Sequence, residues 1–145
     1  MPHRLIQDVL RNQRLLHLEP AVSVREAARE MSVRHIAAVL VTDGEDHLDG
    51  IFTERDLLDR VVVPGLNPDA TPLSKVMTAK PATVSPGQTV REALQLMDAK
   101  GVRHLPVAVD GRVLGVVSMR DFVADEVAVL DQLHELETQY AEHMR

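Results

Sequence analysis

Residues 115–121, GVVSMRD, repeat a pattern that the chain has already used at residues 50–56, GIFTERD. Each stretch has a glycine, two apolar residues, a hydroxyl residue, one variable position and then Arg-Asp. Apolar residues that end at a hydroxyl three positions before an acidic residue are typical of a strand that runs into the first turn of a helix. Because the pattern recurs 65 residues later (115 − 50), it predicts two copies of one structural unit.

The similarity between the copies extends upstream of these stretches. PAVSVREAAREM (20–31) aligns with PGQTVREALQLM (86–97) at an offset of 66 (86 − 20), and VRHIAAVL (33–40) aligns with VRHLPVAV (102–109) at an offset of 69 (102 − 33). This alignment predicts a longer helix end in the second copy and a longer hairpin in the first. Insertions at such places are typical of diverged structural copies, and we expect the copies to pair around a pseudo-twofold axis.

Each copy has the elements of a β-α-β-β-α unit that opens with a short apolar run. Ser23 precedes Glu26 by three residues, as Thr89 precedes Glu92, which predicts a capping box at the start of an amphipathic helix in each copy. Gly101 is expected to end the second of these helices. Two β-branched runs joined by a glycine-containing turn then predict a hairpin, followed by a last helix. A short helix should lead into each copy.

The linker between the copies is marked by three prolines and one glycine in VPGLNPDATP (63–72). A stripe with 4-3-4-3 spacing near the C-terminus predicts a coiled-coil-like helix: Val129, Leu133, Leu136, Tyr140 and His143. We expect this helix to support a homodimer, the alternative being a helix docked on its own module. The predicted organisation is a first repeat at 1–63, a linker at 64–72, a second repeat at 73–126 and a helical extension at 127–145.

The composition argues against several functions. The formal charge is −6 and the basic residues are scattered, so nucleic acid is not expected as the main partner. The chain has no cysteine, which excludes disulfides and thiolate chemistry. No apolar run approaches the roughly 18 to 20 residues that cross a bilayer, and the first residues lack the apolar core of a signal peptide. We therefore expect a cytoplasmic protein with no membrane contact.

Histidine and carboxylate positions predict neither a metal centre nor a catalytic site. The seven histidines include no His-x₃-His or HExxH pair, and HELET (134–138) lacks the second histidine of HExxH. A metal would enter only as Mg²⁺ that accompanies a nucleotide phosphate. No nucleophile is paired with a base in the sequence pattern, so we expect no enzyme activity.

From about residue 5 to 126, the repeated unit, the VRHLPV strand (102–107) and the two motif endings resemble CBS domains, named after cystathionine β-synthase. A tandem pair of these domains is called a Bateman module. The resemblance implies an α/β fold in which two repeats pack through their sheets with pseudo-twofold symmetry. It also implies two clefts that often hold adenosine nucleotides (AMP, ADP or ATP), with no obligatory cofactor.

The resemblance also implies a role for each position of the repeated motif. The aspartate accepts both hydroxyls of a ribose, a role that suits an acceptor-only carboxylate. The hydroxyl residue contacts ribose or phosphate, and the arginine lies near the phosphates. The residues at these positions are Asp56, Thr53 and Arg55 in the first copy, and Asp121, Ser118 and Arg120 in the second.

The cleft walls are expected from the opening strand of the opposite repeat. Thr83 and Val84 would face Asp56, and His17 and Leu18 would face Asp121, on the pattern of the family. Arg103 and His104, like Arg34 and His35, would lie between the clefts and meet phosphate oxygens. Apolar walls would sandwich the base, and the residues expected for this are Val84, Leu18, Leu105 and Pro106.

Two interpretations of the repeated motif remain open. Thr53 with Asp56, and Ser118 with Asp121, also match a capping box, which explains their spacing without any ligand. The alignment further places Ala37 against Pro106 and His17 against Thr83, which favours the cleft at Asp56 over the cleft at Asp121.

The function predicted from these features is that of a sensor that binds an adenosine nucleotide and signals its occupancy to a client protein in trans. The alternative is a ligand-free structural or assembly module that acts through dimerisation. An unrecognised enzyme is a third possibility, and it has the least support because no catalytic constellation is found.

Overall fold

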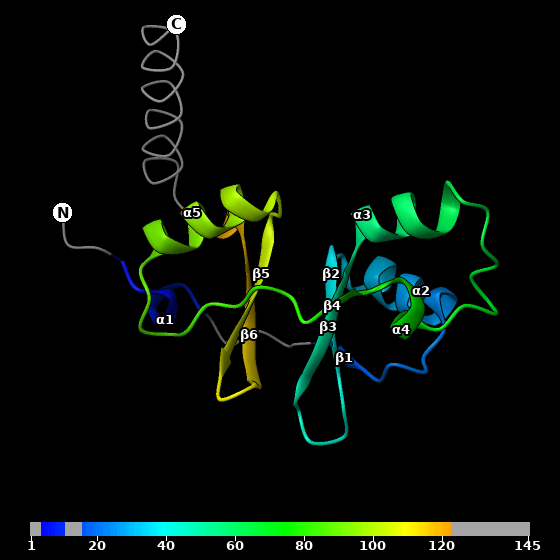
Figure 1. Cartoon of the computed structure of the whole chain (residues 1–145), viewed down its shortest axis with the longest axis horizontal. Coiled ribbons are helices and arrows are strands. Elements are labelled where there is room, and N and C mark those ends of the chain that lie inside the picture. The colour runs from blue at the N-terminus through cyan, green and yellow to red at the C-terminus, as the bar shows by residue number, and fades with distance from the viewer. Residues whose placement is uncertain (1–3, 11–15, 123–145) are drawn as a thin grey trace, which may run out of the picture.

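The structure is a computed structural model that describes residues 4–10 and 16–122. Figure 1 shows two α/β halves side by side. One half contains β1 (His17–Leu18), α2 (Val24–Arg34), β2 (Ala38–Thr42), β3 (Leu48–Thr53), α3 (Glu54–Asp56), the π-helical segment η1 (Leu57–Val62), α4 (Leu73–Val76) and β4 (Thr78–Ala79). The other contains α1 (Ile6–Val9), α5 (Val90–Lys100), β5 (His104–Val109), β6 (Arg112–Ser118) and the 3₁₀ turn η2 (Met119–Asp121). Within the described ranges, no helix is both long and apolar enough to cross a membrane.

The sheet topology confirms the predicted β-α-β-β-α order. The first half has a four-stranded sheet in the order β1-β2-β3-β4, in which β1 runs parallel to β2 and the other neighbours are antiparallel. In the second half β5 and β6 form an antiparallel hairpin, and Val84 adds a parallel bridge to Val107. The predicted C-terminal helix lies outside the described residues.

The helix boundaries follow from the predicted caps. Ser23 Oγ accepts a hydrogen bond from the amide of Glu26 at 3.2 Å, and Thr89 Oγ1 accepts one from the amide of Glu92 at 3.1 Å. These bonds satisfy amides that the first turn of a helix leaves free. At the other end of α5, Gly101 adopts the left-handed conformation with φ 66°, as a C-terminal stop requires.

The predicted offset of 69 for the VRH segments is wrong, because α2 and α5 have the same length of 11 residues. His35 ends α2 in the left-handed conformation with φ 54°, the role that Gly101 has in α5 (35 + 66 = 101). The first VRH segment therefore closes a helix, whereas in the second copy His104 already begins β5. Histidine is one of the few residues other than glycine that is enriched in this conformation.

The first strands of the two hairpins are related by the offset of 66, and their second strands by an offset of 65. Both have an irregularity at the same place, between Val41 and Thr42 in β2 and between Val107 and Ala108 in β5. The sheets then meet through equivalent side chains, since Leu48 corresponds to Val113 (48 + 65). The cluster at this interface contains Leu40, Ile51 and Val113, with Ala38, Leu48 and Val116 packed against it. The predicted packing through the sheets is confirmed.

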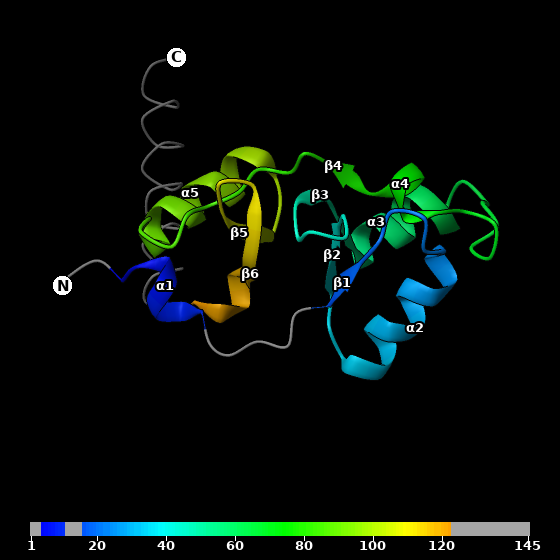
Figure 2. The same ribbon diagram turned by 90° about the horizontal axis from the view of Figure 1, so that it is seen from below.

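The two short leading helices pack on the opposite halves, which the sequence did not predict. Ile6 and Val9 of α1 lie in the core formed by α5, β5 and β6, and the Ile6 amide donates to Gln88 O at 2.8 Å. Leu73 and Val76 of α4 lie in the core of the first half. Figures 1 and 2 both show α1 beside α5 and β6, and α4 contacts β3 and η1 of the first half. The core of each half is therefore completed by the short helix that precedes the other repeat in the sequence.

Gly50, the first residue of the repeated motif, is required by this crossing of the chain. Strand β4 pairs with β3, and this brings Met77 and Thr78 over the backbone of Gly50. A β-carbon at this position would lie 2.8 Å from the carbonyl oxygen of Thr78, closer than packing allows. Glycine is therefore used here for close approach of two backbone segments.

Candidate functional site

A cavity of about 290 Å³ lies between the two halves, beside the second copy of the motif. This volume is close to the lower end, roughly 300 Å³, of the range for small-molecule sites. The second half lines it with His104, Val116, Ser118, Arg120 and Asp121, and the first half lines it with Leu16, Ile36, Ala37, Ala38 and Leu40. One side of the cavity is therefore polar and charged, and the other is apolar.

The polar side is built where β6 ends and η2 begins. The amide of Ser118, the last residue of β6, donates to Asp121 Oδ2 at 2.7 Å. The next amide, that of Met119, donates to the carbonyl of Arg103 at 3.0 Å, which ties the turn to the start of β5. Asp121 remains exposed at the cavity. A carboxylate held in this way can accept further hydrogen bonds from a ligand.

His104 is the most buried titratable group of the cavity, and its surroundings favour the neutral imidazole. Burial and the neighbouring positive charge of Arg120 lower the pKa of His104 from its ordinary value of 6.5. The carboxylates of Asp121 and of Glu54, which belongs to the first half, act in the opposite direction without cancelling this effect. A neutral imidazole can both donate and accept a hydrogen bond.

We expect His104 to make the stability of the ligand-free protein depend on pH. Because its pKa is lower in the folded than in the unfolded chain, the unfolded chain binds more protons below about pH 6.5. The contribution of His104 is therefore fully present above its unfolded pKa and is lost as the pH falls through its folded pKa. Urea unfolding of the wild type and of His104→Gln between about pH 5 and 7.5 should show the difference moving in favour of the wild type as the pH rises. A constant difference would contradict this assignment.

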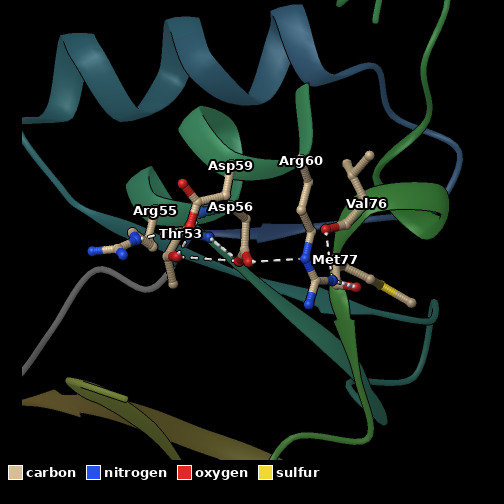
Figure 3. Close-up of polar contacts among 7 residues, drawn as sticks. All are labelled: Thr53, Arg55, Asp56, Asp59, Arg60, Val76 and Met77. Carbon is tan, nitrogen blue, oxygen red and sulfur yellow. Dashed lines mark hydrogen bonds and ion pairs between the residues drawn. The ribbon is translucent and has the colours of Figure 1, made fainter. Parts of the chain in front are cut away.

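The first copy of the motif forms a closed set of contacts around Asp56 (Figure 3). Asp56 Oδ2 accepts hydrogen bonds from the amide and the hydroxyl of Thr53, at 2.9 and 3.1 Å. Thr53 Oγ1 in turn accepts from the Asp56 amide at 3.3 Å. Arg60 Nε lies 3.6 Å from Asp56 Oδ1, and the Asp56 side chain is only 13% exposed. The capping interpretation of the motif therefore describes this copy, and a capping box between Ser118 and Asp121 is also present in the second copy.

Among the residues described, the ion pair of Arg55 is with Asp59 and not with Asp56. Its Nε donates to Asp59 Oδ2 at 2.8 Å, one turn further along, and this contact raises the pKa of Arg55. The Arg55 side chain is 82% exposed. The equivalent residue in the second copy, Arg120, lines the cavity. The two arginines at the same motif position therefore differ in environment: Arg55 pairs with Asp59, and Arg120 lines the cavity.

The four residues predicted from the opening strands all lie outside the cavity lining. Val84 is 1% exposed in the core of the second half, so it offers a ligand almost no surface, while Thr83 is exposed. His17 Nδ1 lies 3.5 Å from Asp46 Oδ1, and Leu18 packs against the core of the first half. The residue of this strand that lines the cavity is Leu16.

The remaining predicted residues belong to β5 and the segment before it. Leu105 is buried in the core of the second half, and Pro106 is buried within β5, where it pairs with Val116. Arg103 is exposed next to the polar turn. The structure therefore brings His104, Ser118, Arg120 and Asp121 together, and leaves the other predicted residues elsewhere.

The apolar wall was missed because the strands were aligned three residues out of register. In the structure Ala38 is the counterpart of His104 (38 + 66), and Leu40 is the counterpart of Pro106 (40 + 66). The absence of proline at Ala37 therefore has no bearing on the clefts. The equal lengths of VREAAREMSVR and VREALQLMDAK were the signal that could have fixed the register. The cavity described above lies at Asp121, the cleft that the sequence placed second.

Metal binding has no support in the described part of the chain. Among these residues, no three histidine, aspartate or glutamate side chains come together as a group that could hold a metal ion.

Comparison with known proteins assigns the fold to one class, that of paired CBS domains. The CBS domain family model matches residues 6–63 and again 73–126. The chain belongs to this family. A CBS domain-containing protein of Arabidopsis thaliana is 36% identical over 126 residues, which are 87% of this chain and 24% of the relative. The chain thus spans about a quarter of the length of that relative.

Solved structures of paired CBS domains share the fold. A CBS domain-containing protein of Agrobacterium tumefaciens has a TM-score of 0.74 at 32% identity, covering 81% of this chain and 94% of the other. A CBS domain protein of Pyrobaculum aerophilum, solved in complex with AMP, has a TM-score of 0.78 at 25% identity, covering 88% and 98%. The chain is therefore a CBS domain pair similar to proteins of which one binds AMP.

Proposed function

We propose that this CBS domain pair is a regulatory module that binds an adenosine nucleotide in the cavity at Asp121. The observation that carries the proposal is the composition of this cavity, where an exposed carboxylate and a guanidinium face an apolar wall contributed by the other half. The AMP complex of the similar protein from Pyrobaculum aerophilum supports the choice of ligand.

Each part of a nucleotide has a chemically suitable partner in this cavity. The carboxylate of Asp121 would accept hydrogen bonds from both ribose hydroxyls. Arg120 would bind phosphate oxygens, and Mg²⁺ would accompany the longer phosphate chains of ADP or ATP. The base would lie against Leu16, Ile36 and Ala37, with the neutral His104 available to donate or accept a hydrogen bond.

Because the two halves contribute opposite walls, a bound nucleotide would hold them in one relative arrangement. A ligand shifts a conformational equilibrium by its differential affinity for the states, so occupancy would change what the module presents to a partner. We propose that the output reaches a client protein in this way, in the cytoplasm and from a homodimer. No catalytic step is proposed for the chain.

Calorimetry and thermal unfolding with AMP, ADP and ATP test the proposal, with GMP as the control for the base. A nucleotide at about 100 times its dissociation constant should stabilise the protein by roughly 2.7 kcal/mol, which raises the melting temperature by several degrees. No heat and no shift with any adenosine nucleotide at millimolar concentration would overturn the proposal.

A ligand-free assembly module is the second candidate, and the contacts of Asp56 favour it. Its carboxylate is satisfied by Thr53 and Arg60 without any ligand. If the nucleotide titrations are negative while sedimentation shows a stable oligomer, this second function would replace the first.

A further inference from the structure

We propose that Arg60 closes the first copy of the site, so that the chain takes one nucleotide, at Asp121, although it carries the binding motif twice. This inference rests on the function proposed above and adds the stoichiometry and the residue that sets it. Arg60 lies in η1, one helical turn after Asp56, and it is not part of the repeated motif.

The contacts of Arg60 connect the Asp56 carboxylate to the chain that follows the linker (Figure 3). Its Nε lies 3.6 Å from Asp56 Oδ1. Its Nη1 donates to the carbonyl oxygens of Met77 and Val76, at 2.9 and 3.2 Å. Since Thr53 already donates twice to Oδ2, both oxygens of this carboxylate have partners within the protein.

The second copy has no equivalent of this arrangement in its sequence. Four residues after Asp121 the chain carries Asp125, where four residues after Asp56 it carries Arg60. In the structure Asp121 is exposed, whereas the Asp56 side chain is 13% exposed. The two aspartates of the repeat therefore differ in their availability to a diol.

The wall opposite each aspartate differs in the same direction. Ala37 and Arg103 are counterparts (37 + 66 = 103), and each accepts an equivalent hydrogen bond at 3.0 Å, Ala37 from the Glu54 amide and Arg103 from the Met119 amide. The small Ala37 lines the cavity at Asp121. The counterpart of Ala37 in the second copy carries the much larger side chain of Arg103, which is exposed. This second observation does not depend on Arg60.

A ribose at Asp56 would compete with Arg60 for Oδ1 and with Thr53 for Oδ2, because a diol uses both carboxylate oxygens. Movement of Arg60 would also release the carbonyls of Val76 and Met77, which belong to the segment that crosses Gly50. Partners lost in this way reduce the affinity of any ligand that must displace them. Arg60 therefore takes the place beside the Asp56 carboxylate that a ligand would need.

Calorimetric stoichiometry with AMP tests this role, using Arg60→Met to keep the length of the side chain and remove its charge. We expect one AMP per chain for the wild type and two for Arg60→Met. The matched control is Arg25→Met, because Arg25 likewise ties a helix to a segment distant in sequence, through Asp69 at 2.8 Å, and its side chain is 47% exposed against 48% for Arg60. This control should bind one AMP.

Asp121→Ala, alone and combined with Arg60→Met, separates the two proposals. One site that disappears in Asp121→Ala and a second that appears in Arg60→Met, and persists in the double variant, would support both. If both the wild type and Arg60→Met bind one AMP, the proposed role of Arg60 is overturned and the proposed function stands.

If the wild type binds no AMP and Arg60→Met binds one, the role of Arg60 is supported and the proposed function at Asp121 is overturned. Two sites in the wild type would overturn the role of Arg60, and none in any variant would overturn both.

Discussion

Replacing Asp121 with alanine should weaken AMP binding by at least about 100-fold. Hydrogen bonds to a charged group contribute about 1.5–3 kcal/mol each, and the ribose would lose two of them. A loss of about 3 kcal/mol corresponds to more than a factor of 100 in the dissociation constant. Calorimetry should therefore show weak or no binding at concentrations that saturate the wild type. The fold should survive, because Asp121 is exposed.

The matched control for this variant is Asp56→Asn, which changes the same position in the other copy of the motif. It should leave AMP affinity at the wild-type value, since the proposed site lies at Asp121. Wild-type affinity in Asp121→Ala, with circular dichroism showing both variants folded, would contradict the assignment. Loss of binding only in Asp56→Asn would move the site to the first copy.

The second large effect is expected from Ile6→Ala, which should lower the free energy of unfolding by about 2–5 kcal/mol. Ile6 is fully buried in the core of the second half, although it lies more than 80 residues before the strands that surround it. Truncation removes buried methyl groups and leaves a cavity, which gives a cost of this size in other cores. Urea unfolding monitored by circular dichroism measures the loss.

Val33→Ala is the control for this variant, because Val33 is an apolar residue that lies exposed on α2. Its effect should stay within about 0.5 kcal/mol. An equally small effect of Ile6→Ala would mean that α1 is not docked on the second half in solution. A large effect would establish that the N-terminal segment of the first repeat stabilises the second half.

The elements of the fold could be predicted because their signals are local. Ser23 and Thr89 mark helix starts, and Gly101 marks a helix end, through contacts with residues only a few positions away. The register between the copies is not local in this sense. The repeated VRH letters suggested an offset that the left-handed conformation of His35 rules out, and an error of three residues displaced the predicted apolar wall.

The candidate site was predictable in part for a similar reason. Ser118, Arg120 and Asp121 share one turn, so the motif alone brings them together. The opposite wall depends on how the halves pack, which no short pattern records, and Leu16 and Ala38 were missed. Asp56 and Asp121 also differ in exposure. Asp56 is paired with Arg60, which lies outside the repeated pattern. The sequence favoured the cleft at Asp56 over the cleft at Asp121, whereas the cavity of the structure lies at Asp121.

The exchange of α1 and α4 has a consequence for how the chain folds during synthesis. The first half cannot complete its core until Leu73 and Val76 have been made, and α1 has no partner until the chain has passed Gln88. Contacts between residues this far apart in sequence slow folding, because a long loop must close before they form. Helix α1 therefore lacks its packing partner until the second half has been synthesised. The two repeats are copies in sequence, but the core of each half includes a helix that precedes the other repeat.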